Sequence, residues 1–304
     1  VMQNFLNNSS SSGFIFQGFS DYPDIQIPLF CLFLLIYLLM LQGNVLILTV
    51  IYQTSLLHTP MYFFLCNLAF IDMFSSSVSQ PKLLSMLLGG DNTISFGGCM
   101  TQLYCFMSLT CTEFVSLTVM AYDRYVAICN PLRYLIVMNR RVCVILFIAC
   151  WMVGFALPVS HTVLISHLPF CRSQTIDHFF CDPSILLTLS CASTFSIELL
   201  TYVLCSLVAL PAFALTFKSV EERQKGFSTC GSHLAVVILF YGTILIIYTR
   251  PSSQYSSSKG LKPFSVVYTV LIPMVNPLIY TLRNKEVKSA LWKIIRNNFF
   301  MNKY

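Results

Sequence analysis

The chain contains repeated, mostly apolar stretches of about 20 or more residues, long enough for a helix to cross the roughly 30 Å hydrocarbon core of a membrane. Seven such stretches follow one another, and none alternates apolar and polar residues as a membrane barrel strand does. Their bounds are 28–52, 60–88, 98–128, 142–164, 195–217, 227–249 and 263–282. We therefore predict an all-α membrane protein, a bundle of seven transmembrane helices.

The composition agrees with a membrane protein and weighs against other classes. Hydrophobic residues make up 56% of the chain, more than the polar groups of a soluble domain could cover. The net charge of +6 is spread between the apolar stretches, which argues against nucleic acid as a partner. We find no catalytic triad, metal-ligand spacing, phosphate-binding glycine loop or repeat of fixed period, so we expect neither an enzyme, nor an organic cofactor, nor a duplicated transporter.

The distribution of positive charge predicts the orientation. With the N-terminus outside, thirteen of the 18 Lys and Arg residues lie on the cytoplasmic side and five lie outside, the bias that cytoplasmic loops show. Two overlapping N-glycosylation sequons begin at Asn7 and Asn8, and they are usable only if this segment is lumenal. We predict an extracellular segment 1–27, the helix bundle 28–282 and a cytoplasmic tail 283–304.

The tail 283–304 carries an amphipathic pattern. Apolar residues such as Val287, Ala290 and Leu291 recur at helical spacing between lysines and arginines. Such a helix rests its apolar face in the membrane interface and places its cations near anionic headgroups. We predict a short amphipathic helix on the inner leaflet, with membrane lipid as its partner; a solvated tail is the alternative.

Two acidic residues, Asp72 and Glu113, fall in the middle of predicted helices, and Asn44 and Asn276 lie at similar depth. Ionisable groups inside a membrane are costly and need a partner or a function. Two carboxylates in a medium of low dielectric constant cannot both ionise unless a cation joins them. The residues leave a bound cation and a shared proton open.

Four cysteines fall in predicted outer segments: Cys99, Cys171, Cys181 and Cys191. That compartment is oxidising, so we expect disulfides there. Four cysteines allow three pairings, which the spacing leaves open.

Four sequence motifs resemble the signature of vertebrate olfactory receptors, which are rhodopsin-like G-protein-coupled receptors. They are LHTPMYFFL at 57–65, MAYDRYVAIC at 120–129, FSTCGSHL at 227–234 and PMVNPLIY at 273–280. They stand in order in the predicted second, third, sixth and seventh helices and cover nearly the whole chain. The first motif and FFCD at 179–182 resemble the larger, tetrapod-type class.

The resemblance implies two disulfides and an ion site. It pairs Cys99 with Cys181, which leaves Cys171 to pair with Cys191. In resembling receptors the positions that match Asp72 and Glu113 surround a sodium ion. Sodium and a shared proton are thus the two alternatives for this pair.

The resemblance also implies a signalling role at the plasma membrane, where the chain would be a multi-pass protein. The partners would be a small odorant and a heterotrimeric G protein of the stimulatory, olfactory type, which raises cyclic AMP. In the third helix the implied switch is Asp123, Arg124 and Tyr125, which frees Arg124 to contact the G protein. In the sixth helix His233 would stand near that arginine, although a core role for this histidine is equally open. In the seventh helix the implied hinge is Asn276, Pro277 and Tyr280.

We expect the ligand pocket between the outer halves of the third, fifth and sixth helices. Helical spacing turns seven residues toward it: Phe106, Met107, Thr110, Cys111, Tyr241, Leu245 and Tyr248. This apolar wall with a few hydroxyls suits a small volatile molecule with one polar group. No ionisable residue is expected in the pocket, which disfavours amine and acid ligands. For each of these residues, plain helix packing is the alternative.

The predicted fifth helix departs from the family pattern, because Thr216-Phe217-Lys218 runs almost directly into Glu221-Glu222-Arg223. The cytoplasmic extension that the family carries there is missing. The remaining residues of this stretch still suffice to span the bilayer. The alternative function is therefore a receptor-like protein that folds but couples poorly.

Overall fold

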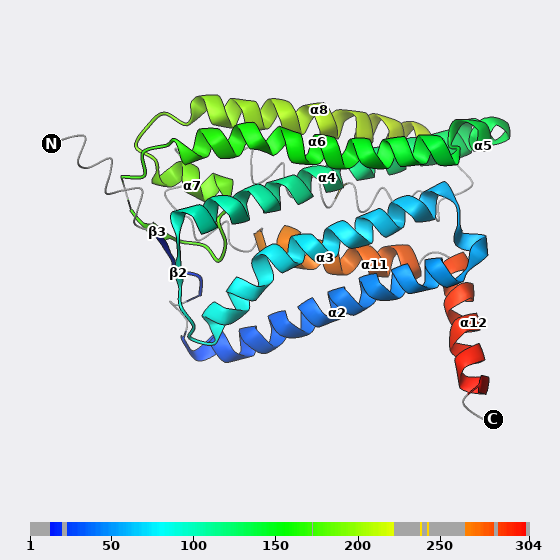
Figure 1. The fold of residues 1–304 in the computed structure, drawn as a ribbon, viewed down its shortest axis with the longest axis horizontal. Helices are drawn as coiled ribbons and strands as arrows, with labels where there is room; N and C mark the ends of the chain where they lie inside the picture. The colour runs from blue at the N-terminus through cyan, green and yellow to red at the C-terminus, as the bar shows by residue number, and fades with distance from the viewer. Residues whose placement is uncertain are drawn as a thin grey trace.

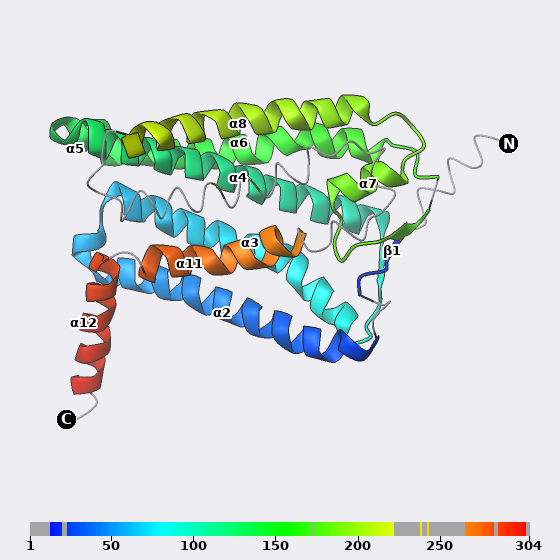
Figure 2. The same ribbon diagram turned by 180° about the vertical axis from the view of Figure 1, so that it is seen from behind.

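The structure is a computed structural model that describes residues 13–19, 23–171, 173–221, 238, 242, 265–282 and 285–301. Long helices lie side by side in an elongated bundle (Figures 1 and 2). Five stretches of the described chain are helices long and apolar enough to cross a membrane. Their helices are α2 (Gln26–Gln53), α3 (Pro60–Leu87), α4 (Phe96–Cys129), α6 (Arg140–Ser166) and α8 (Phe195–Glu221).

Five of the predicted helices are confirmed to within a few residues, and one boundary is wrong. Helix α8 continues to Glu221, beyond the predicted end at 217. In the seventh predicted segment the helix includes a π-helical turn, η6 (Val267–Leu271), followed by α11 (Ile272–Leu282). The sixth predicted segment, 227–249, lies outside the described residues except for 238 and 242. The number of spans and the orientation stay predictions.

Helix α4 lies at the centre of the bundle and packs against α3, α6 and α8. Its first turn is capped by Ser95, whose Oγ accepts a hydrogen bond from the Gly98 N–H at 3.1 Å. It approaches α6 closely at Gly154, where a Cβ atom would lie only 2.0 Å from Thr112 Oγ1. Glycine is required here because any side chain would push the two helices apart.

A chain of hydrogen-bonded polar groups also joins three of the helices. Trp151 of α6 donates from Nε1 to Asn67 Oδ1 of α3 at 2.9 Å. Asn67 Nδ2 in turn donates to Ser116 Oγ of α4 at 2.9 Å. Hydrogen bonds between spanning helices supply attraction that apolar packing lacks in lipid.

A small β-sheet, which the sequence analysis did not predict, lies at one end of the bundle. Strand β1 (Phe14–Phe16) pairs antiparallel with β2 (Thr93–Ile94) and parallel with β3 (Thr175–Ile176). Strands of two or three residues carry too little alternation to be recognised in a sequence. We call this the sheet end; it also holds the short helix α7 (Pro183–Leu189) (Figure 1).

The opposite end of the bundle, which we call the arginine end, holds Arg124, η3 (Pro131–Arg133), α5 (Tyr134–Val137) and α12 (Lys285–Met301). Helix α12 projects away from the bundle (Figures 1 and 2). It confirms that the tail contains a helix, which covers most of the predicted tail segment 283–304. Tyr62 Oη of α3 donates to Glu286 Oε2 of α12 at 2.7 Å, which ties α12 to the bundle.

Candidate functional site

A cavity lies between α4, α6, α7 and α8, near the sheet end. Four residues of the third helix were predicted to face the pocket, and all four line this cavity: Phe106, Met107, Thr110 and Cys111. The three residues expected from the sixth helix, Tyr241, Leu245 and Tyr248, lie outside the described residues. The walls that the structure describes are apolar apart from a few hydroxyl, thiol and imidazole groups.

Helix α6 supplies a wall that the sequence analysis missed. His161 lines the cavity and is 4% exposed, whereas no ionisable residue was expected in the ligand pocket. The rotation of α6 about its close contact with α4 decides which of its residues face inward, and helical spacing within one segment does not encode that rotation. A histidine within an apolar span was the signal that could have found it.

His161 hydrogen-bonds to a residue on the facing helix. Its Nε2 lies 3.0 Å from Thr201 Oγ1 of α8. Thr201 Oγ1 itself donates to the Ile197 carbonyl at 2.9 Å. Thr201 and Cys205, like His161, line the cavity, so the fourth and fifth spanning segments contribute most of its polar groups.

Two disulfides hold the segments at the sheet end. Cys99, at the start of α4, is bonded to Cys181, with 5.6 Å between the Cα atoms. Cys171 is bonded to Cys191, with 6.0 Å between the Cα atoms, which closes a loop between α6 and α8. These are the pairs that the resemblance implied.

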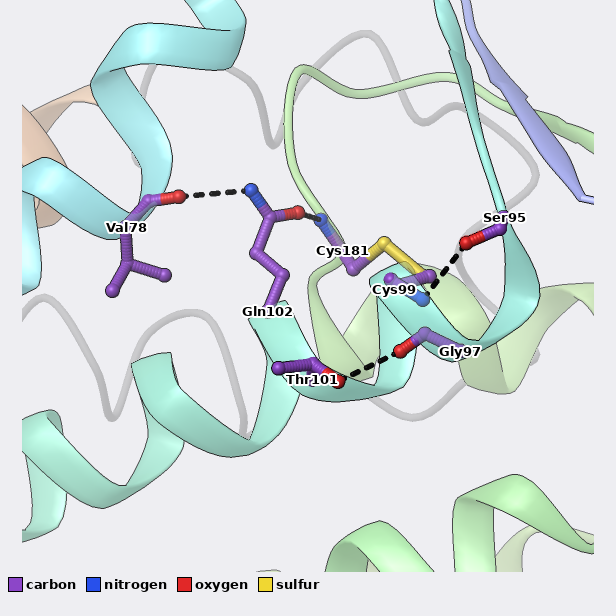
Figure 3. Close-up of a disulfide and its surroundings, with 8 residues drawn as sticks. Val78, Ser95, Gly97, Cys99, Thr101, Gln102 and Cys181 are labelled. Carbon is purple, nitrogen blue, oxygen red and sulfur yellow. Dashed lines mark hydrogen bonds between the residues drawn. A yellow bond between two sulfur atoms is a disulfide. The ribbon is translucent and has the colours of Figure 1, made fainter.

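Gln102 strengthens the attachment of the loop to α4, a role not predicted from the sequence (Figure 3). Its Oε1 accepts a hydrogen bond from the Cys181 N–H at 3.0 Å, and its Nε2 donates to the Val78 carbonyl at 3.0 Å. One side chain thus joins α3, α4 and the disulfide-bonded loop beside the cavity.

The two predicted acidic residues meet in the middle of the bundle. Asp72 and Glu113 are buried, and Asn276 lies between them. Asn276 Nδ2 is 3.2 and 3.1 Å from the two Asp72 carboxylate oxygens and 3.5 Å from Glu113 Oε1. Asn44 does not share these bonds, because its amide donates to the Met40 carbonyl of its own helix at 3.0 Å.

At the arginine end, the Asp123 carboxylate accepts hydrogen bonds from two side chains. Arg124, whose side chain is 20% exposed, donates to Asp123 Oδ2 from both Nε and Nη2. Tyr134 of α5 donates from Oη to Asp123 Oδ1 at 2.8 Å. Burial raises the pKa of the Tyr134 phenol and the nearby Asp123 carboxylate raises it further, so the phenol stays protonated and donates.

Other residues of the predicted switch are described only in part. Tyr125 is partly buried on α4. His233 lies outside the described residues, as do the sequons at Asn7 and Asn8. Pro277 and Tyr280 belong to α11, but their side chains lie outside the description. Tyr134 was missed because its contact with Asp123 depends on the fold of the segment after α4.

Known proteins resemble this chain along nearly its whole length. The family described as olfactory receptor matches residues 31–298. Olfactory receptor 8C8 of Mus musculus is 46% identical over 305 residues, which cover 95% of this chain and 97% of the relative. Olfactory receptor 5AR1 of Mus musculus is 44% identical over 302 residues, covering 95% of this chain and 97% of the relative. Olfactory receptor 6Y1 of Homo sapiens is 44% identical over 302 residues, which cover 95% of this chain and 93% of the relative.

Proposed function

Because the chain belongs to the olfactory receptor family, we propose that it binds a small, mostly apolar odorant in the cavity between α4, α6 and α8 and activates a stimulatory, olfactory-type G protein. Members of this family are G-protein-coupled receptors of the plasma membrane that cross it several times, and they are not enzymes. The observation that carries the proposal is the largely apolar cavity beneath the disulfide-bonded loop.

The side chains that line the cavity suit a volatile ligand. Phe106, Phe114 and Leu204 offer apolar contact surface, and Thr110 adds a hydroxyl group. A small ligand gains affinity mainly from apolar burial, while a few polar groups fix its orientation. The wall that is described carries no lysine, arginine or acidic residue, which favours uncharged ligands.

In this proposal the sheet end faces outward and the arginine end faces the cytoplasm. Both disulfides lie at the sheet end, as an oxidising exterior requires. Arg124 then lies where a G protein can reach it, held in place by the Asp123 carboxylate until activation. An ion pair at the end of a helix can be exchanged for another partner, because its net stability is modest.

The alternative of a poorly coupling receptor is not favoured, because olfactory receptors match this chain along nearly its whole length. Helix α8 runs for 27 residues, to Glu221. At a rise of about 1.5 Å per residue it exceeds the roughly 30 Å thickness of the hydrocarbon core. The short connection noted in the sequence therefore leaves a complete spanning helix.

A cyclic AMP reporter in cells that express the receptor tests the proposal. We expect some odorants of a chemically diverse panel to raise cyclic AMP, and Arg124→Ala to abolish the response at equal surface level. Arg141→Ala, which changes an exposed cation at the same end, serves as the matched control. A receptor that reaches the surface and answers no odorant contradicts the proposal; a calcium response without cyclic AMP contradicts only the stimulatory type.

We further propose that a sodium ion binds between Asp72 and Glu113. The donor set fits a hard cation, since carboxylate, amide and hydroxyl oxygens are what such ions prefer. Ser76, one helical turn from Asp72, has a buried Oγ without a hydrogen-bond partner in the described part of the chain. Within those residues no three His, Cys, Asp or Glu side chains gather. Asn276, once its amide turns so that Oδ1 replaces Nδ2, and Ser76 would complete the set around the two acids. Bound sodium would offset one of the two negative charges and so reduce the repulsion between the buried carboxylates.

The sodium proposal predicts that thermal stability depends on the cation. The purified receptor should unfold at a higher temperature in sodium chloride than in choline chloride, and Asp72→Asn should remove the difference. Asn44→Ala, which removes an amide that donates to the Met40 carbonyl of its own helix, is the matched control. Stability that changes with pH but not with sodium would instead indicate a shared proton.

A further inference from the structure

We propose that His161 is the hydrogen-bond acceptor of the cavity and makes the receptor select odorants that carry an O–H or N–H group. The inference rests on the proposed function, because it assumes that the cavity between α4, α6 and α8 is the odorant site. It deepens that function by naming the chemical class of ligand.

The hydrogen bonds around Thr201 determine which ring nitrogen of His161 carries the proton. A hydroxyl group has one proton to donate, and Thr201 Oγ1 donates it to the Ile197 carbonyl at 2.9 Å. In the arrangement we infer, this proton stays hydrogen-bonded to the carbonyl, and Thr201 accepts from His161 Nε2, 3.0 Å away. Nε2 is then the protonated nitrogen, and in the neutral imidazole Nδ1 is left with a lone pair.

The lone pair on Nδ1 is available to a ligand. His161 lines the cavity and is nearly buried, and among the residues that the structure describes its one hydrogen-bond partner is Thr201, through Nε2. Nδ1 can accept a hydrogen bond but cannot donate one while this tautomer is held. An alcohol, a phenol or an amide N–H satisfies it, whereas an ether or a ketone brings a second lone pair and leaves it unsatisfied.

No other group on the described walls offers the same discrimination. The Thr110 hydroxyl can donate or accept, so it accommodates either class of ligand. The Cys111 and Cys205 thiols are weak in both roles. Leaving a buried acceptor unsatisfied corresponds to about a tenfold to hundredfold loss of affinity.

Pairs of isomeric ligands provide the test. Straight-chain primary alcohols from hexanol to decanol are compared with their isomeric methyl ethers, which have the same atoms but no O–H group. The readouts are the shift in the unfolding temperature of the purified receptor in lipid nanodiscs and the cyclic AMP response of cells. We expect each bound alcohol to stabilise the receptor at concentrations at least tenfold lower than its ether.

Three variants assign the preference to His161. His161→Phe should remove the difference between alcohol and ether, because alcohols lose their hydrogen-bond partner and ethers no longer leave a buried acceptor unsatisfied. Thr201→Val removes the hydroxyl that keeps the proton of His161 on Nε2, so it should reduce the preference for alcohols over ethers. Thr201→Ser keeps a hydroxyl and should retain that preference. Ser160→Ala, which changes an exposed neighbour on α6, should behave as wild type.

Each outcome decides the inference separately from the proposed function. Equal stabilisation by alcohols and ethers in the wild type, or a preference that survives in a folded His161→Phe protein, overturns the inference. A folded receptor that neither class stabilises overturns it as well, while a cyclic AMP response to other compounds would keep the proposed function. Stabilisation by alcohols without any cyclic AMP response supports His161 as the acceptor and contradicts the signalling role.

Discussion

The two ends of helix α4 are held in contrasting ways. At the sheet end, Cys99 is covalently bonded to Cys181, and both are fully buried. At the arginine end, the described contacts of Asp123 are hydrogen bonds and one ion pair, and the side chain of Arg124 is partly exposed. A covalent bond inside an apolar cluster cannot be exchanged, whereas a partly exposed ion pair can find another partner at little cost.

This difference matches two separate roles for the two ends of α4. The cavity lies next to the fixed end, where a rigid wall reduces the entropy lost when a ligand binds. The exchangeable contacts lie at the end that would meet a G protein. Changes at the sheet end should therefore lower stability, and changes at the arginine end should alter signalling while the fold survives.

Removing the Cys99–Cys181 disulfide should have the largest effect. Cys181→Ser is expected to destabilise the protein by about 2–5 kcal/mol, because the unfolded chain is no longer constrained. The receptor should then be retained inside the cell, as measured by surface immunolabelling and thermal unfolding. Cys31→Ser, at an exposed free cysteine, is the control. Normal surface delivery of Cys181→Ser would show that the sheet end is held mainly by noncovalent packing.

Gln102 offers a smaller change at the same end. Gln102→Leu removes the bonds to the Cys181 N–H and the Val78 carbonyl, and should lower the free energy of unfolding by about 1–3 kcal/mol. Gln102→Glu keeps an oxygen for the Cys181 N–H and should lose less. Thermal unfolding of both variants measures the order, and equal losses would contradict the role of the Cys181 bond.

The smallest expected effect lies at the arginine end. Tyr134→Phe removes one hydrogen bond to Asp123 and leaves the ring, so about 1 kcal/mol of the contacts that hold Asp123 is lost. Under the proposed function this bond stabilises the resting arrangement, so basal cyclic AMP should rise by a few-fold, with little change in unfolding temperature. Tyr122→Phe, at an exposed tyrosine on α4, should leave the basal signal unchanged. A large loss of stability in Tyr134→Phe would break the contrast between the two ends.

Much of the fold could be predicted because the thickness of the hydrocarbon core sets the length of each spanning helix independently of the other helices. A span needs about 20 apolar residues whatever surrounds it, so five helices could be placed to within a few residues: α2, α3, α4, α6 and α8. The amphipathic pattern after α11 likewise depends only on local spacing, and α12 bears it out. The motifs identified the family without any knowledge of packing.

The sequence by itself determined the helices, the family and four residues of α4 that line the cavity. Only the tertiary structure decided that His161 and Thr201 face each other there, that Gln102 supports the disulfide, and that Tyr134 bonds to Asp123. Each of these pairs joins separate segments, and each depends on how a helix is rotated or a loop folded. Apolar periodicity is weak in helices that are apolar on every side, so the rotation is determined by close contacts such as that between Gly154 and Thr112.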